Sequence, residues 1–242
     1  KFIEDWAQNN QNQSNHLFHF LSNDKLKKKW KVEIGKGEGR VGPLIISPII
    51  YKEIIYTIDN RSELQARDAE SGKLIWNLLL NEENKEEIDF IGGLAANNDV
   101  LAISTGLGNI YILNYLTGKQ IWKKNFLSQI SAPPIIERDK IFVITDDNQL
   151  LAIDVTSGVT LWNHSGNIET VSILGGVSPA IDNGLVYVTY TSGEIFALNQ
   201  NNGAIQWYEN LGSEGLLSDG LITDIQSPPV IYKDQLYVSS FS

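Results

Sequence analysis

The segment from Ala66 to Trp76, with the sequence ARDAESGKLIW, contains a pattern that returns three more times along the chain. The pattern is Asp or Asn, three residues, Gly, three more residues and Trp. Its other copies run from Asn114 to Trp122, from Asp154 to Trp162 and from Asn199 to Trp207. The tryptophans recur about every 40 to 46 residues, and this period is typical of a β-propeller blade.

Each copy of the pattern predicts a tight hairpin between two strands. The Asp or Asn side chain can accept hydrogen bonds from the backbone N–H groups that follow it and so start a turn, and Gly supplies the positive φ that the turn needs. The Trp in the following strand can fill the gap between neighbouring sheets, so we interpret it as structural rather than as a ligand-stacking residue. The residues with this predicted structural role are Gly72, Trp76, Gly118, Trp122, Gly158, Trp162, Gly203 and Trp207.

A second strand pair precedes each hairpin. The sequence AIDNGLVYV, from Ala180 to Val188, places Asn-Gly between two β-rich runs, which is a strong hairpin signal. The stretches from Pro134 to Ile144 and from Ile49 to Tyr56 have the same form in the third and first repeats. Each repeat therefore predicts four short strands, A to D in chain order. The four blades are expected at about 45–80, 94–126, 132–165 and 177–211.

Partial repeats flank these four blades. Residues 26–35 resemble a lone D strand that contains Trp30, a further predicted structural residue, and residues 227–242 resemble strands A and B of a fifth unit. Residues 1–24 form an N-terminal segment ahead of the propeller. We therefore predict an all-β fold, a β-propeller of four-stranded blades with tryptophan-docking repeats, as a fragment of a longer propeller. A five-bladed ring closed by residues 26–35 is the alternative.

The composition excludes several classes of protein. The net charge of −10 does not favour binding to nucleic acid or to anionic lipid, and we interpret the lysine cluster at residues 25–31 as a guarded strand edge. The chain has no Cys, which excludes disulfides, thiolate metal sites and a Cys nucleophile. No stretch predicts a transmembrane helix or a signal peptide, and the absence of Met leads us to expect an upstream segment.

The repeat resembles the PQQ-like propeller superfamily, which includes quinoprotein alcohol dehydrogenases and the BamB family, lipoproteins of the outer-membrane β-barrel assembly machinery. Trp6-x-Gln8 with Asn15-His16 is similar to the opening segment of many superfamily members. Two loops point to BamB. Val171 to Pro179 is similar to a family loop with Leu-x-Leu-Arg-Gly, although Leu174 stands where Arg is common. Thr223 to Val230 is similar to a loop with Asp-x-Asp, and it keeps the first Asp.

The resemblance implies a function and a larger protein. Family members have about eight blades, and in them these two loops contact a POTRA domain of the barrel-assembly protein. The resemblance thus implies a non-enzymatic scaffold at the periplasmic face of the bacterial outer membrane, held there by a lipid anchor outside this chain. Nascent outer-membrane proteins are a second implied partner, through exposed strand edges. The implied partner-binding residues are Val171, Ile173, Leu174, Asp224 and Gln226.

The alternative function is a periplasmic quinone-dependent or ligand-binding propeller, and an adaptor for another protein partner is a third hypothesis. A quinoprotein dehydrogenase needs a Ca²⁺ site, a catalytic Asp and usually a vicinal Cys pair. Residues 145–149 lack the spacing of a Ca²⁺ loop, and we interpret them and Gly106-x-Gly108 as turns. We interpret His16 and His19 as packing residues, because His164 is the only other His. We therefore expect no catalytic, cofactor-binding or metal-binding residue.

Overall fold

The computed structural model describes residues 5–17, 25, 27–35, 46–80, 92–167, 177–211, 225 and 227–240. None of these residues lies in a helix that is long and apolar enough to cross a membrane, and all regular structure among them is β. Their strands pair into four sheets of four strands and one sheet of two, each antiparallel and in chain order. The predicted all-β class and the four-stranded repeat are therefore confirmed.

Each four-stranded sheet is one blade, and its strands follow the order A to D. Blade 1 consists of β1 (Ile49–Tyr51), β2 (Ile54–Ile58), β3 (Glu63–Asp68) and β4 (Leu74–Leu79). Blade 2 consists of β5 (Gly92–Asn97), β6 (Val100–Thr105), β7 (Asn109–Asn114) and β8 (Gln120–Asn125). Blade 3 consists of β9 (Ile135–Glu137), β10 (Lys140–Thr145), β11 (Gln149–Asp154) and β12 (Thr160–Ser165). Blade 4 consists of β13 (Ala180–Asp182), β14 (Leu185–Thr189), β15 (Glu194–Asn199) and β16 (Ile205–Asn210). The two-stranded sheet, unit 5, consists of β17 (Val230–Tyr232) and β18 (Gln235–Tyr237).

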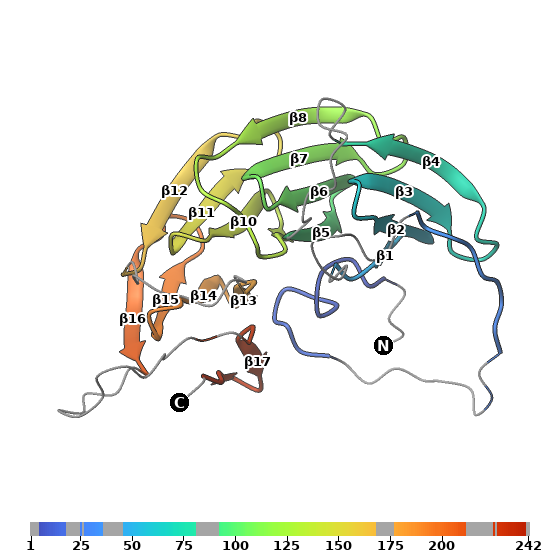
Figure 1. Ribbon diagram of the computed structural model, residues 1–242. Coiled ribbons are helices and arrows are strands. Elements are labelled where there is room, and N and C mark those ends of the chain that lie inside the picture. The colour runs from blue at the N-terminus through green and yellow to red at the C-terminus, as the bar shows by residue number, and fades with distance from the viewer. Residues whose placement is uncertain are drawn as a thin grey trace.

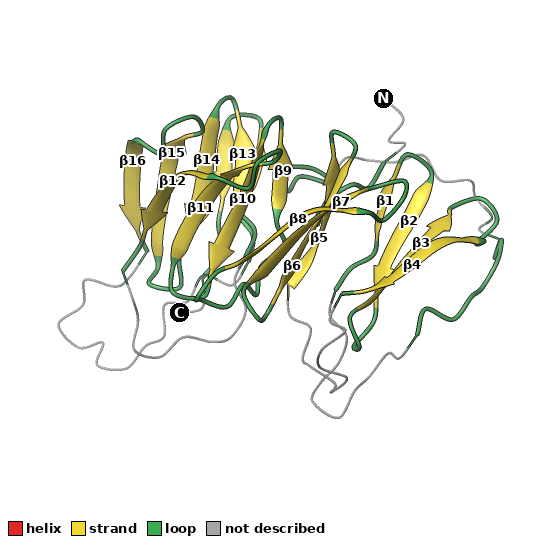
Figure 2. Cartoon of the chain, turned by 90° about the horizontal axis from the view of Figure 1, so that it is seen from above, coloured by secondary structure: helices red, strands yellow, loops and turns green. Residues whose placement is uncertain are grey.

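The blades follow one another around an arc (Figure 1). Their D strands β4, β8, β12 and β16 lie on the convex side, and A strands line the concave side. A strands of successive units are neighbours at three junctions, where β1 contacts β5, β5 contacts β9 and β13 contacts β17. In each antiparallel blade the A–B and C–D turns lie at one end, the turn end, and the B–C turns and D–A connections lie at the other, the loop end (Figure 2). The units therefore radiate from an axis on the concave side.

The C–D hairpins have the predicted turn chemistry. In blade 1 the Asp68 carboxylate accepts a hydrogen bond from the Ser71 N–H at 2.7 Å. Gly72 follows with a φ of 72°, a conformation that costs Gly little. Asn114 and Asp154 accept equivalent backbone hydrogen bonds in blades 2 and 3, and Asn199 in blade 4 accepts one from the N–H two residues on. Each hairpin thus turns within a few residues and returns the chain into a D strand.

Tryptophans of the D strands pack on turn glycines of the following blade. A Cβ added to Gly118 would lie 2.8 Å from Cδ2 of Trp76, and Nε1 of Trp76 donates a hydrogen bond to the Tyr115 carbonyl at 3.3 Å. The indole therefore occupies the space that any larger residue at Gly118 would need. The equivalent pairs are Trp30 with Gly72, Trp122 with Gly158 and Trp162 with Gly203. Trp207, in the last complete blade, is 39% exposed.

The hydrophobic core lies between the blades. One buried cluster joins blades 1 and 2, a second joins blades 2 and 3, and a third joins blades 3 and 4. The B and C strands supply most of it, and Leu101, Ile103, Phe142 and Ile144 are examples that are almost wholly buried. A four-stranded sheet cannot bury both faces alone, so each blade depends on its neighbours for stability.

Residues 27–34 differ from the prediction of a lone D strand. They belong to no strand, although Trp30 packs on Gly72 and its Nε1 donates a hydrogen bond to the Ala69 carbonyl at 3.0 Å. A strand needs a hydrogen-bonded neighbour, and the described residues contain none for this segment. It is therefore an extended segment that one tryptophan attaches to blade 1.

Candidate functional site at the loop end of blade 4

The predicted partner-binding residues belong to two D–A connections. Val171, Ile173 and Leu174 lie in the connection from blade 3 to blade 4, and Asp224 and Gln226 lie in the connection from blade 4 to unit 5. All five lie outside the described residues. The structure does describe the residues from which both connections leave the sheets, and it shows how those residues are held.

A buried carboxylate holds the start of the first connection. Glu194, at the beginning of β15, is only 5% exposed. Its Oε2 accepts hydrogen bonds from the Asn167 N–H and from the Ser192 hydroxyl, both at 2.7 Å. Its Oε1 accepts the Asn167 side-chain amide at 2.8 Å. From blade 3, the Asn148 amide donates to the Asn167 carbonyl at 2.6 Å. Three donors thus compensate the desolvation of the carboxylate, and Asn167 is fixed by both blades that it connects.

The second connection starts at the same turn. Leu211 follows β16 and donates its N–H to the Gly193 carbonyl at 3.0 Å. Gly193 directly precedes Glu194, so one B–C turn of blade 4 holds the starting points of both connections. The hydrogen bond from Leu211 has a counterpart in each of the other blades, from the backbone N–H that follows the D strand to a backbone carbonyl of the B–C turn. These pairs are Leu80 with Ser62, Phe126 with Gly108 and Gly166 with Asn148. The contacts of the Glu194 carboxylate are an addition to this repeated arrangement.

The residues that follow the connections are also anchored. The Ser178 hydroxyl donates to the Pro133 carbonyl at 2.8 Å. The side-chain amide of Asn15, from the N-terminal segment, donates to the carbonyls of Pro179 at 3.1 Å and Pro229 at 2.9 Å. Ile225, which stands between two of the predicted contact residues, is buried. The first connection therefore begins and ends at residues that are tied to blade 3, whereas the second begins at a residue tied to its own blade and ends at one tied to the N-terminal segment.

An aromatic cluster packs behind this turn. The ring centroids of His164 and Tyr190 are 5.9 Å apart with nearly parallel planes, and His164 lies 4.4 Å from the Phe196 ring. The Tyr190 hydroxyl donates to the His164 carbonyl at 3.1 Å and lies 2.9 Å from Nδ1 of the same residue. Burial lowers the pKa of His164 and outweighs the opposing effect of the Glu194 carboxylate, and burial raises the pKa of Tyr190 far above its usual range. The cluster is therefore neutral near pH 7 and supports the turn by packing.

The described residues contain no group of three or more His, Asp or Glu side chains that could hold a metal ion. His16 stacks on Tyr232 with the ring centroids 4.5 Å apart, and His19 lies outside the described residues. Residues 145–149 form a turn, as predicted, in which Asn148 has a φ of 56°. The arrangement at the loop end of blade 4 thus provides a rigid base for two neighbouring connections.

Sequence reasoning did not single out the residues that build this base. Glu194, Asn167 and Asn148 carry no recognisable motif, and their contacts join parts of the chain that are far apart. One signal was present: Glu194 starts the strand EIFALN, and four apolar residues follow it directly. A carboxylate in such a strand needs hydrogen-bond donors when it is buried.

The fold and the repeated tryptophan docking define the class of this chain as a PQQ-like β-propeller. Solved structures of this class share its architecture. Quinohemoprotein alcohol dehydrogenase from Comamonas testosteroni matches with a TM-score of 0.72 at 15% identity, over 97% of this chain and 45% of that chain, and this likeness concerns the fold alone. BamB from Moraxella catarrhalis matches with a TM-score of 0.70 at 25% identity, over 81% of this chain and 58% of that chain.

Within that class, the chain belongs to the family described as outer membrane protein assembly factor BamB, whose family model matches residues 60–242. An uncharacterised protein of Rickettsia prowazekii is 30% identical over 202 residues, which cover 81% of this chain and 48% of the relative. The BamB of Nitrosomonas eutropha is 22% identical over 208 residues, which cover 86% of this chain and 48% of the relative. The chain thus spans about half the length of these relatives.

Proposed function

We propose that this chain is a non-enzymatic scaffold in outer-membrane protein assembly. Its membership of the BamB family supports this role. The observation in the structure that carries the proposal is the turn at Gly193 and Glu194, which holds the starting residues of two connections side by side. Loops on a rigid propeller are the usual place for binding residues, and in this proposal the two loops that start at one turn act as a single contact surface.

The partner in this proposal is a POTRA domain of the barrel-assembly protein, at the periplasmic face of the outer membrane. Val171, Ile173 and Leu174 would supply the apolar centre of the contact, and Asp224 and Gln226 would supply hydrogen bonds at its rim. The fixed ends of both connections support the proposal, because a preorganised surface loses less conformational entropy on binding.

Calorimetric titration of this chain with the POTRA domains tests the proposal. We expect saturable binding with a dissociation constant on the order of 1–10 μM. Ile173→Glu places a charge at the apolar centre, so we expect it to weaken binding by at least about tenfold. The matched control is Ile121→Glu on the convex edge strand β8, where Ile121 is 49% exposed, and this variant should bind like the parent chain. A well-folded chain that gives no heat of binding would refute the proposed interface.

The quinone-dependent or ligand-binding propeller is the second candidate, because the fold that this chain shares with quinohemoprotein alcohol dehydrogenase is compatible with either function. It requires a small molecule on the axis. Titration with a pyrroloquinoline quinone and Ca²⁺, followed by absorbance, separates the two candidates: a saturable spectral change would favour this candidate over the scaffold.

A further inference from the structure

The N-terminal segment crosses the concave side of the arc and contacts an A strand of every unit. The segment is described over residues 5–17 and lies beside the inner strands (Figure 1). Trp6 pairs with Ile50 of β1 through two backbone hydrogen bonds of 2.8 Å each. Farther along, the Ala7 carbonyl accepts a hydrogen bond from the Ala96 N–H of β5 at 2.7 Å. The Gln13 carbonyl accepts one from Ile181 of β13 at 2.6 Å, and the Ser14 carbonyl accepts one from Ile231 of β17 at 3.0 Å.

Blade 3 is contacted by a side chain. The Gln8 Oε1 accepts the Ile136 N–H of β9 at 2.8 Å, and the Gln8 Nε2 donates to the Ile136 carbonyl at 3.3 Å. The carboxamide thus makes the pair of bonds that a neighbouring strand would make. It does so where the segment itself turns, because Asn10 and Gln11 have φ values of 55° and 78°.

The five N–H donors occupy equivalent positions. Each lies two residues before the first residue of its A–B turn, and that turn residue has a positive φ in every unit. The donors, here called the axial row, are the N–H groups of Ile50, Ala96, Ile136, Ile181 and Ile231. An A strand is the inner edge of its sheet, so these groups have no partner within their own blade. One segment therefore satisfies the same unpaired group in five successive units.

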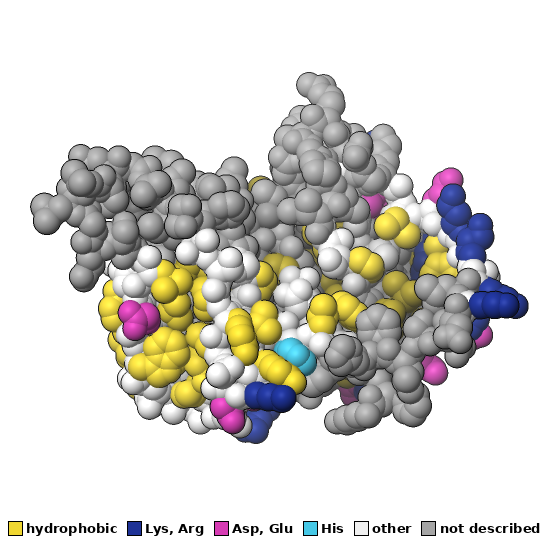
Figure 3. All heavy atoms as spheres, turned by 90° about the horizontal axis from the view of Figure 1, so that it is seen from below, with side chains coloured by type: hydrophobic (Ala, Val, Ile, Leu, Met, Phe, Trp, Pro, Cys, Tyr) yellow, Lys and Arg dark blue, Asp and Glu magenta, His cyan; other side chains and the backbone are white. Residues whose placement is uncertain are grey.

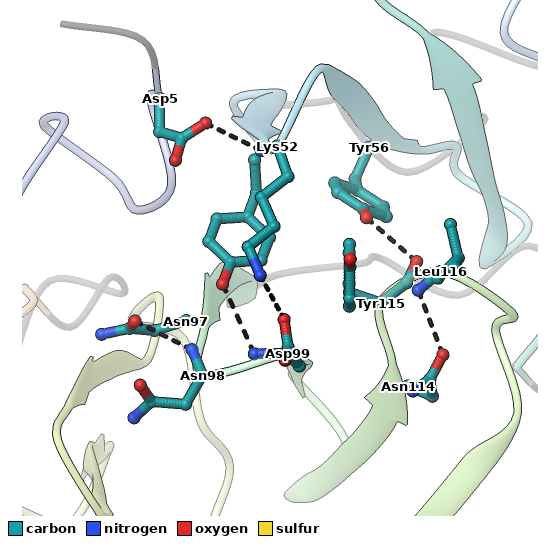
Figure 4. Close-up of polar contacts among 10 residues, drawn as sticks. Asp5, Lys52, Tyr56, Asn97, Asn98, Asp99, Asn114, Tyr115 and Leu116 are labelled. Carbon is teal, nitrogen blue, oxygen red and sulfur yellow. Dashed lines mark hydrogen bonds and ion pairs between the residues drawn. The ribbon is translucent and has the colours of Figure 1, made fainter.

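The ends of the segment are fixed as well. The Asp5 carboxylate accepts the Lys52 N–H at 2.7 Å, and the Lys52 ammonium pairs with Asp99 of blade 2 (Figure 4). At the other end, the Asn15 side-chain amide bridges the Pro179 and Pro229 carbonyls, which belong to blade 4 and unit 5. Gln8 and Asn15 are each only 4% exposed. Buried carboxamides with this many partners are expensive to leave unpaired, so they select the position of the segment.

We propose that the axial row is a peptide-binding site whose ligand is the chain's own residues 5–15. The segment acts as a strap: it binds as an extended peptide, mainly through backbone carbonyls, and the carboxamides of Gln8 and Asn15 set its register. It joins five units, whereas the contacts between the described strands of different units are between successive units. The strap also occupies the turn end of the axis, so a second extended peptide reaches these five donors only by displacing it. This inference does not depend on the proposed partner.

Amide hydrogen exchange on the full chain tests the role of Gln8. In Gln8→Ala we expect the Ile136 N–H to lose protection by about tenfold, because it loses the acceptor that Gln8 supplies, while amides of β6 and β10 keep their protection. The matched control is Gln13→Ala, which removes the same kind of side chain but keeps the backbone carbonyl that accepts the Ile181 N–H. Unchanged protection at Ile136 in a folded Gln8→Ala chain would overturn the proposal.

Peptide binding tests the site independently of that variant. A labelled peptide of residues 5–16 is titrated into the full chain and into its Gln8→Ala/Asn15→Ala variant, with binding followed by fluorescence anisotropy. The strap of the parent chain competes at a high effective concentration, so we expect the peptide to bind the variant at least about tenfold more tightly than the parent. A peptide with both substitutions should lose this binding. Equal affinity of the two peptides for the variant, or no binding of either to a folded variant, would refute a specific site.

Discussion

At the scale of single residues, the glycine of each C–D turn meets two requirements at once. It adopts a positive φ, and it leaves the space in which an indole packs, from the extended segment at Gly72 and from the preceding blade at the other three turns. At Gly118 both requirements apply, since its φ is 68° and Trp76 lies against it. At Gly184, in an A–B turn, φ is 78° but nothing lies within 4 Å of an added Cβ. These two positions therefore separate backbone strain from loss of docking.

We expect Gly118→Ala to destabilise the chain more than Gly184→Ala. The Gly184 variant should lose about 1 kcal/mol from the left-handed backbone conformation alone. The Gly118 variant should lose about 2–4 kcal/mol, because the new methyl group also displaces Trp76. The free energies of unfolding in urea measure both effects. Equal losses would mean that the indole moves aside without cost and that the docking is not specific.

His164 of blade 3, which packs on Tyr190 and Phe196 of blade 4, is expected to make the stability of the chain depend on pH. Burial lowers its pKa in the folded chain below the ordinary value of 6.5. As the pH falls through that value, the unfolded chain therefore binds a proton at His164 more readily than the folded chain does. Stability should therefore fall as the pH drops from about 7.5 to about 5.5. In His164→Phe the aromatic packing remains, and the Tyr190 hydroxyl keeps the carbonyl of residue 164 as its acceptor. The loss of stability at low pH that comes from protonation of His164 should therefore disappear. Urea midpoints at both pH values provide the measurement, and identical pH profiles of parent and variant would contradict the assignment.

At the scale of secondary-structure elements, the B–C turn of blade 4 is the one that organises the candidate site. The turn lies between β14 and β15 and contacts the residues that follow β12 and β16. Strand ends at the loop end are held by backbone hydrogen bonds in all four blades, and blade 4 adds a buried carboxylate to this arrangement. The connection that starts at Asn167 is thus tied to the blade that it enters as well as to the blade that it leaves.

Glu194→Gln is expected to loosen this base. Both carboxylate oxygens accept hydrogen bonds from Asn167. The substitution turns one of them into an NH₂ group, which donates and cannot accept, so one of these hydrogen bonds is lost whichever way the amide points. We expect a loss of about 1–3 kcal/mol in stability and faster hydrogen exchange at the Asn167 amide. The control is Glu209→Gln on the exposed strand β16, which should change neither quantity by a measurable amount. If the Asn167 amide exchanges equally slowly in Glu194→Gln and in the parent chain, the carboxylate does not hold the connection.

At the scale of the whole molecule, stability resides in the contacts between units. The three buried clusters each join two blades, and the N-terminal segment adds contacts across all five units. The described surface of the concave side is also uneven: hydrophobic side chains gather toward β16 to β18, and a group of Lys and Arg side chains stands on the blade 1 side (Figure 3). The same strands carry exposed aromatic residues, which are Trp207 and Tyr208 in β16, Tyr232 in β17 and Tyr237 in β18.

The sequence by itself determined the repeat, the strands within it and the chemistry of its turns. These features depend on residues a few positions apart, such as Asp68 and Gly72, and local contacts are readable from spacing. The lone D strand predicted at residues 26–35 has no counterpart among the described residues 27–35, because a strand exists only when a neighbour pairs with it. Only the tertiary structure decided that Glu194 holds Asn167 and that Gln8 lies on Ile136. Those contacts join residues that are distant in the sequence, and their position depends on how the blades turn about the axis, which no local pattern encodes.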